Sequence, residues 1–173
     1  MSGLTGPVAV RVFPGHANQA AEARRWVRVQ AHAAGKLAHA PGELAADDAA
    51  LVLTELFANA IKHTRSGDKG GTVTVAVTAD GTIHVHDLGT TGQPPCLTLA
   101  TTPAGLRLLE LTGRGLPIVA ALCPDHAAMP AAQCAVAGPG DPAAHAGGCC
   151  ISCRPESWPD ASAVAGARAA RAS

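Results

Sequence analysis

The chain has 173 residues, 13 basic and 13 acidic side chains, and an apolar content of 47%. This length fits one domain with a single hydrophobic core. The balanced charge argues against the concentrated cationic surface that binds a nucleic-acid backbone, so we expect no direct nucleic-acid binding. No run of about 18 apolar residues could cross a bilayer and no export signal opens the chain, so we expect no membrane association and a cytoplasmic protein with six reduced cysteines.

The first part of the chain predicts a strand followed by two helices. Residues Val8 to Phe13 alternate weakly and are followed by Pro14-Gly15, which is typical of a strand and a turn. Residues 18–34 are good helix formers with apolar side chains at helical spacing. Pro41-Gly42 then interrupts the chain before a longer helix, which we expect from about Glu43 to Arg65.

The middle of the chain contains its clearest hairpin. Thr72 to Thr78 alternates strictly, Asp80-Gly81 supplies a tight turn, and Thr82 to Asp87 alternates again. Residues 88–112 mix Gly, Pro and Thr with scattered Leu and predict a long connection, a length that often marks a functional loop. Gly115 to Leu122 returns to a helical pattern.

The C-terminal part has a weaker pattern. Residues 137–148 predict a flexible loop, and Cys149 to Cys153 predicts a last, buried strand. The Ala/Arg-rich residues 156–173 predict a frayed tail beyond a domain of residues 1–155. Two sets of side chains raise the question of a metal site. Cys149, Cys150 and Cys153 with His145 lack a paired-ligand spacing, and we expect His84 and His86 to face solvent or a partner subunit.

Glu55 and Asn59 lie one turn apart on the polar side of the second helix, together with Lys62, and His63 lies at its border. One interpretation is the solvated side of an amphipathic helix. The other is a binding site, because Asn is a mediocre helix former and a mid-helix Asn needs a reason. The Asn59 carbonyl oxygen and phosphates would then complete an oxygen shell around Mg²⁺, and Glu55 would polarise an attacking hydroxyl or water.

Asp87 ends the hairpin on an apolar side. Alternation carries it onto the same side as Ile83 and Val85, where a carboxylate needs a partner. If the strand ends earlier, the side chain caps a turn or faces water. Otherwise it accepts a hydrogen bond from the exocyclic amine of adenine, and Gly89 lets the backbone pass close to the base.

A glycine-rich turn precedes the third helix. Its residues leave the unpaired N–H groups of the helix start accessible, which suits a phosphate. A short Gly-x-Gly is also typical of a flexible hinge, and its arginine can contact phosphate or point into solvent. The residues of the turn are Gly113, Arg114, Gly115 and Leu116.

In this order along the chain, the three motifs resemble the ATP-binding boxes of the Bergerat-fold ATPases, the histidine kinase-like ATPases. The segments are ELFANAIKH at 55–63, DLG at 87–89 and TGRGLPIV at 112–119. The chain is most similar to small actinobacterial ATP-binding proteins that resemble anti-sigma-factor serine/threonine kinases. The FPG segment at 13–15, before ARRWV at 23–27, is similar to the start of that subgroup.

This resemblance implies an α+β fold, a two-layer sandwich with helices on one face of a mixed, largely antiparallel sheet. It implies that ATP lies under a mobile loop at 88–112, that Asn59 ligates Mg²⁺ and that Glu55 is the general base. Asp87 would select adenine, with Gly89 beside the base. The remaining residues that would contact the nucleotide are His63, Gly113, Arg114, Gly115 and Leu116.

The resemblance further implies a serine/threonine kinase that phosphorylates a small antagonist protein and thereby controls a sigma factor. A homodimer is a further possible assembly. The first alternative is a non-catalytic binding module whose nucleotide controls a partner protein. The second is the catalytic half of a split sensor histidine kinase. No Gly-x-Ser-x-Gly elbow and no phosphate loop ending in Lys-Ser/Thr supports a hydrolase or a P-loop protein.

Overall fold

The computed structural model describes residues 7–33, 44–91, 115–123 and 126–154. The strands are β1 (Pro7–Pro14), β2 (Thr72–Thr78), β3 (Ile83–Asp87), β4 (Ala127–Pro130) and β5 (Cys149–Cys153). The helices are α1 (Gln19–Ala33), α2 (Leu44–His63), α4 (Gly115–Leu122) and α5 (Pro142–Ala146), with 3-10 turns η1 (Arg65–Gly67) and η2 (Ala131–Gln133). None of these helices is long and apolar enough to span a membrane.

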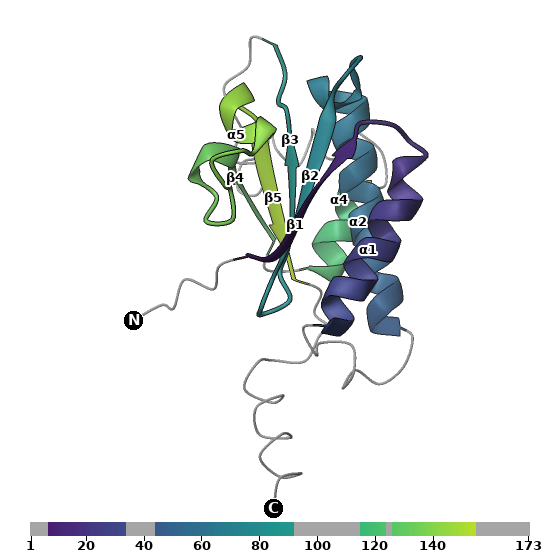
Figure 1. Ribbon diagram of the computed structural model, residues 1–173. Helices are drawn as coiled ribbons and strands as arrows, with labels where there is room; N and C mark the ends of the chain where they lie inside the picture. The colour runs from purple at the N-terminus through teal and green to yellow at the C-terminus, as the bar shows by residue number, and fades with distance from the viewer. Residues whose placement is uncertain (1–6, 34–43, 92–114, 124–125, 155–173) are drawn as a thin grey trace, which may run out of the picture.

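The strands form one sheet in the order β1-β2-β3-β5-β4. Every pair of neighbouring strands in the described part of the chain is antiparallel. The three longer helices α1, α2 and α4 lie on one face of this sheet (Figure 1). The expected α+β sandwich with helices on one face of a largely antiparallel sheet is therefore confirmed.

The main core lies between these helices and the sheet. Val73, Val75 and Val77 of β2 are fully buried there, as the strict alternation of that strand predicts. Phe13 of β1 contacts Trp26 and Phe57 edge to face, with ring centroids 5.9 and 6.2 Å apart. Aromatic content is low, so these rings carry a large share of the apolar area that joins β1, α1 and α2.

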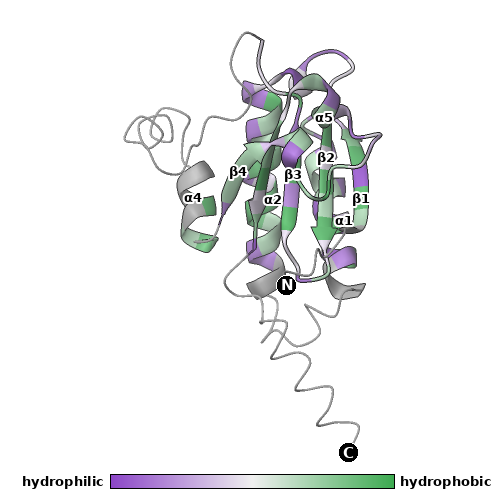
Figure 2. Ribbon diagram, turned by 90° about the vertical axis from the view of Figure 1, so that its left-hand side faces the viewer, coloured by the Kyte–Doolittle hydropathy of each residue, from purple (hydrophilic) through white to green (hydrophobic). Residues whose placement is uncertain are grey.

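The opposite face of the sheet is covered as well, by residues 131–147, here called the covering segment. Thr74 and Ala76 of β2 are buried beneath it although they alternate with the core valines. Figure 2 shows this face, with α5 in front of the strands. A smaller apolar cluster forms there around Ala76 and Val136.

The expectation of a flexible loop at 137–148 is wrong. α5 occupies its second half, where Asp141 caps the helix by accepting a hydrogen bond from the Ala143 N–H. Pro142 fits the first turn, and Gly147 ends the helix in the left-handed conformation. β4 is a further strand without a clear pattern in the sequence.

The expectation of six reduced cysteines is also wrong. A disulfide joins Cys123, just after α4, to Cys153 at the end of β5, with Cα atoms 5.7 Å apart. Cys149 is disulfide-bonded too, whereas Cys134 and Cys150 carry free thiols. The bridged residues are 30 positions apart, so only the tertiary fold brings them together.

The other predicted elements are confirmed within a few residues: the first strand, both long helices, the hairpin, the helix at 115–122 and the buried strand at 149–153. The tail at 156–173 and most of the connection at 88–112 lie outside the described residues.

Candidate functional site

The candidate site is built around α2, which lies between α1 and α4 in two perpendicular views (Figures 1 and 2). On the α1 side, Arg24 donates a hydrogen bond to the Thr54 hydroxyl, 3.2 Å away. Glu55 and Asn59 are one turn apart and flank the buried stripe of α2. Both are half-buried, so neither lies on the fully solvated side of the helix.

Asn59 has an unsatisfied amide. Its Nδ2 atom is buried and has no hydrogen-bond partner among the residues that the structure describes. Buried amides are almost always hydrogen-bonded, so an exception needs a physical explanation. A bound ligand that presents oxygen atoms to this side of α2 would supply the missing partner.

Glu55 and His63 differ in their surroundings. Within the described ranges Glu55 forms no hydrogen bond or ion pair, and the residue is half-buried. His63 is the last residue of α2 and is exposed. Glu55 is thus free to accept a proton from a reactant, whereas the contact of His63 with a nucleotide stays a prediction.

Asp87 lies where the alternation of β3 places it. It is 9% exposed, and it shares its side of the sheet with Ile83 and Val85, which belong to the helix-facing core. Its Oδ1 atom accepts hydrogen bonds from the N–H groups of Gly89 at 2.7 Å and Cys149 at 3.4 Å. Among the described residues nothing donates to Oδ2, which leaves this oxygen for a ligand.

Burial raises the pKa of Asp87 above its usual range. The hydrogen bonds from the Gly89 and Cys149 N–H groups and the nearby His86 charge act in the opposite direction. Burial is the stronger influence, so a hydrogen-bond donor on a ligand would stabilise the charged form of this carboxylate.

The end of α2 is tied to the turn after Asp87. The Arg65 N–H donates to the Gly89 carbonyl oxygen at 2.8 Å, and its guanidinium donates to the carbonyls of Leu88 and Ala146 at 2.7 and 2.5 Å. Ser66, fully buried, accepts a hydrogen bond from the Leu88 N–H at 2.9 Å. These contacts hold Asp87 in a fixed place relative to α2.

Arg65 and Ser66 were not candidates on sequence grounds. Their partners lie 22, 23 and 81 positions away, so no local spacing indicates them. Their only signal is the position directly after a long helix, which is equally typical of an ordinary helix end. Both residues position the site and have no assigned contact with a ligand.

Gly89 is required by the backbone. Its φ is +70°, and an added Cβ would lie 2.8 Å from the Gly147 carbonyl oxygen. A side chain would therefore strain both the turn and its contact with the covering segment. This close approach is to the protein's own backbone, and the predicted place of Gly89 beside a base stays a prediction.

The third motif is described only in part. Gly113 and Arg114 lie outside the described residues, while Gly115 and Leu116 are the first residues of α4. α4 packs against α2, the helix that carries Glu55 and Asn59. The Asn59 amide is on α2 and the Asp87 carboxylate is at the end of β3, and α2 contacts both β3 and α4. Two of the three predicted groups thus lie on neighbouring elements, and the third motif leads into the helix beside them.

Comparison with known proteins identifies the fold. The family model of the histidine kinase-like ATPase domain matches residues 13–134, a range that contains Glu55, Asn59 and Asp87. A search of curated proteins finds no significant match. Because the family model matches well over half of its residues, the chain belongs to the histidine kinase-like ATPase domain family.

Proposed function

We propose that the chain is a Mg-ATP-dependent serine/threonine kinase of the anti-sigma-factor, partner-switching type, and that it phosphorylates a small antagonist protein. The family supports ATP as the nucleotide. The observation that carries the proposal is the half-buried, unpartnered Glu55 one turn before the unsatisfied Asn59 amide. Transfer to a phosphoacceptor hydroxyl needs a general base near the phosphates.

The residues present fit a magnesium nucleotide. An Asn side chain offers one acceptor oxygen and one donor nitrogen. With Oδ1 of Asn59 directed at the cation, Nδ2 would donate to a phosphate oxygen and so satisfy the buried N–H. When bound, Mg²⁺ neutralises charge that develops on the transferred phosphate.

The reaction assigns one task to each of the protein's own groups. The hydroxyl oxygen of the partner's serine or threonine attacks the γ-phosphorus, forming a new P–O bond as the bond between γ-phosphorus and the bridging oxygen of ADP breaks. The Glu55 carboxylate accepts the hydroxyl proton. The Asp87 carboxylate holds adenine, and the start of α4 would hold the phosphates with its unpaired N–H groups.

Replacing Glu55 with Gln is expected to reduce phosphate transfer by about a hundredfold, because a carboxamide cannot accept the proton. Mg-ATP affinity should stay within about threefold, since the amide keeps the size of the side chain. The measurement is transfer of label from γ-labelled ATP to small antagonist proteins encoded nearby, together with calorimetric ATP binding.

Glu22→Gln is the matched control. Glu22 lies on α1 in an exposed ion pair with Arg11, so the same chemical change there should leave transfer unaltered. If the wild-type chain transfers no phosphate but still controls a sigma factor when ATP is bound, the protein is a nucleotide-dependent binding module. In that case Glu55→Gln leaves partner control intact, and the kinase proposal is wrong.

Replacing Asp87 with Asn is expected to weaken ATP binding by about tenfold to a hundredfold. Oδ1 already accepts the Gly89 N–H, so the new NH₂ group would take the place of Oδ2 and face the adenine amine, donor against donor. Guanine carries an acceptor at that position, to which the new NH₂ group can donate. GTP affinity should therefore not suffer the same loss, and the ratio of ATP to GTP affinity should decrease. Competition binding with both nucleotides measures it. An unchanged ratio would remove Asp87 from base recognition.

A further inference from the structure

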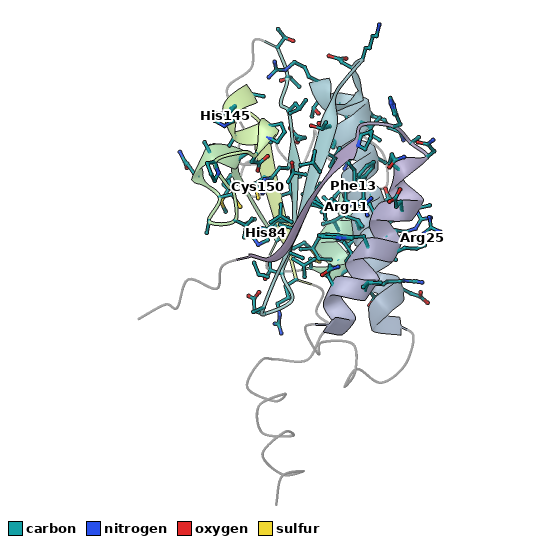
Figure 3. The ribbon with its side chains drawn as sticks, viewed as in Figure 1. Arg11, Phe13, Arg25, His84, His145 and Cys150 are labelled. Carbon is teal, nitrogen blue, oxygen red and sulfur yellow. A yellow bond between two sulfur atoms is a disulfide. The ribbon has the colours of Figure 1, made fainter. Side chains whose placement is uncertain are left out.

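A second group of ligand-type side chains lies on the sheet face away from the long helices, beneath the covering segment. Their ligand atoms all lie within 4.8 Å of one another. Figure 3 shows two of them, His84 and Cys150, on the opposite side of the sheet from Phe13. The full group is His84, His86, Cys134 and Cys150.

The fold brings the four together from three separate segments. His84 and His86 alternate along β3 and so share one face. Cys150 of β5 is the direct antiparallel neighbour of His86. Cys134 follows η2, where its N–H donates to the Ala131 carbonyl oxygen at 3.1 Å. The expectation that both histidines face solvent or a partner subunit is therefore wrong for His86, which is 1% exposed.

The distances among His84, Cys134 and Cys150 are close to those of a tetrahedral metal site. The His84 Nδ1 atom lies 3.4 Å from the Cys134 sulfur and 3.7 Å from the Cys150 sulfur. Ligands of one zinc ion are separated by roughly 3.3–3.8 Å, given zinc–nitrogen and zinc–sulfur bonds of about 2.0–2.3 Å. The two sulfurs are 3.1 Å apart, so a shared ion would spread them by only about 0.7 Å.

His86 is oriented as metal-binding histidines usually are. Its Nδ1 atom contacts the Asp141 carboxylate at 2.5 Å, while its Nε2 atom is buried without a partner among the described residues. A carboxylate on one ring nitrogen fixes the tautomer and leaves the lone pair of the other for a metal. Asp141 is itself held by the Thr74 hydroxyl at 3.1 Å and the Ala143 N–H at 3.0 Å.

We propose that these two histidines and two cysteines bind one Zn²⁺ ion. A set of two thiolates and two imidazoles in tetrahedral arrangement selects zinc over hard cations. All four positions come from the protein, so the ion is structural and has no open position for catalysis. Two thiolates balance its charge, which suits a site where three of the four ligand residues are buried.

The ion would fasten the covering segment to the sheet. The apolar cluster beneath that segment is small: its buried members are Ala76, Cys134, Val136 and Cys150. A bond from Cys134 to a zinc ion held by β3 and β5 adds a cross-link where apolar burial is limited. His84 and His86 alternate with Asp87 along β3 and so face away from the helix layer, which separates this site from the nucleotide residues.

The test is a titration of the reduced, metal-free full chain with Co²⁺, followed by Zn²⁺. We expect one Co²⁺ per chain, with the visible absorption of a tetrahedral ion and a thiolate charge-transfer band, displaced by one equivalent of Zn²⁺. Zinc should also protect Cys134 and Cys150 from alkylation, read by mass spectrometry. Cys134→Ser and His84→Ala should each weaken metal binding by about a hundredfold or more.

His145→Ala is the matched control, because His145 is an exposed histidine of the covering segment whose ring contacts the Pro139 carbonyl oxygen. Reduction also frees Cys123 and Cys153 of the helix-side core, and Cys149, so the spectrum is assigned by its loss in the site variants. His84 is only half-buried, so His84→Ala keeps the test decisive if Cys134→Ser fails to fold. Failure of the reduced chain to take up Co²⁺, or a spectrum that survives both site variants, overturns the proposal.

Discussion

Replacing Asn59 with Ala is expected to lower Mg-ATP affinity by more than a hundredfold while leaving the stability of the nucleotide-free protein unchanged or slightly higher. The loss should exceed the tenfold to hundredfold that is typical of residues which only support a metal ligand, because Asn59 is proposed as the ligand itself. Stability should not fall, since the variant removes a buried Nδ2 that has no partner in the described structure.

This opposite behaviour of affinity and stability separates a binding role from a structural one. Calorimetry with ATP plus Mg²⁺, and with ATP plus a chelator, measures the first, and thermal unfolding without nucleotide measures the second. Asn18→Ala is the control, because Asn18 is exposed just before α1. If Asn59→Ala destabilises the free protein and leaves Mg-ATP affinity unchanged, the amide belongs to the scaffold.

Periodicity predicted the parts of the fold that a single segment determines. The helix of α4 has the predicted bounds, Gly115 to Leu122, because an apolar run after a glycine turn has few alternatives. The hairpin and the burial of Asp87 follow from alternation, which fixes the face of each side chain once the strand is recognised. The Asn59 amide was likewise found from its unusual place in mid-helix.

What the sequence could not predict depends on contacts between distant segments. The covering segment is rich in Ala, Gly and Pro and has no period, and α5 within it is only five residues long. Its capping residue Asp141 also contacts Thr74 and His86, which lie 67 and 55 positions earlier. Both faces of β2 are therefore buried, whereas its alternation of Thr and Val predicts a polar second face.

The zinc ligands illustrate the same limit. Spacing drew attention to Cys149, Cys150 and Cys153 with His145, yet only Cys150 of these belongs to the described cluster. The pairing of β3 with β5 supplies two histidines from 64 or more positions earlier, and a ligand set assembled from three segments has no sequence motif. The register between β3 and β5 decides which ligands meet, and that register depends on the packing of the whole sheet.

Replacing Gly148 with Ala is expected to destabilise the protein by about 2–3 kcal/mol and to weaken ATP binding as well. An added Cβ would lie 1.8 Å from the Asp87 carbonyl oxygen and 3.0 Å from that of Ala143. Both contacts are with backbone atoms, which cannot rotate away as a side chain can. The shift would move the end of β3, which carries the Asp87 carboxylate, relative to α2.

Gly138→Ala is the matched control for this change, because a Cβ at Gly138, in the covering segment that precedes Gly148, would meet nothing within 4 Å. Its effect on unfolding should stay within about 0.5 kcal/mol. Urea unfolding and calorimetric ATP binding, measured side by side on both variants, give the two quantities. Gly148→Ala and Gly138→Ala variants of equal stability would mean that the close approach between β3 and β5 is looser than the structure has it. A Gly148→Ala variant that unfolds more easily but binds ATP normally would instead show that the place of Asp87 does not matter for the nucleotide, and the proposed recognition of adenine would lose its basis.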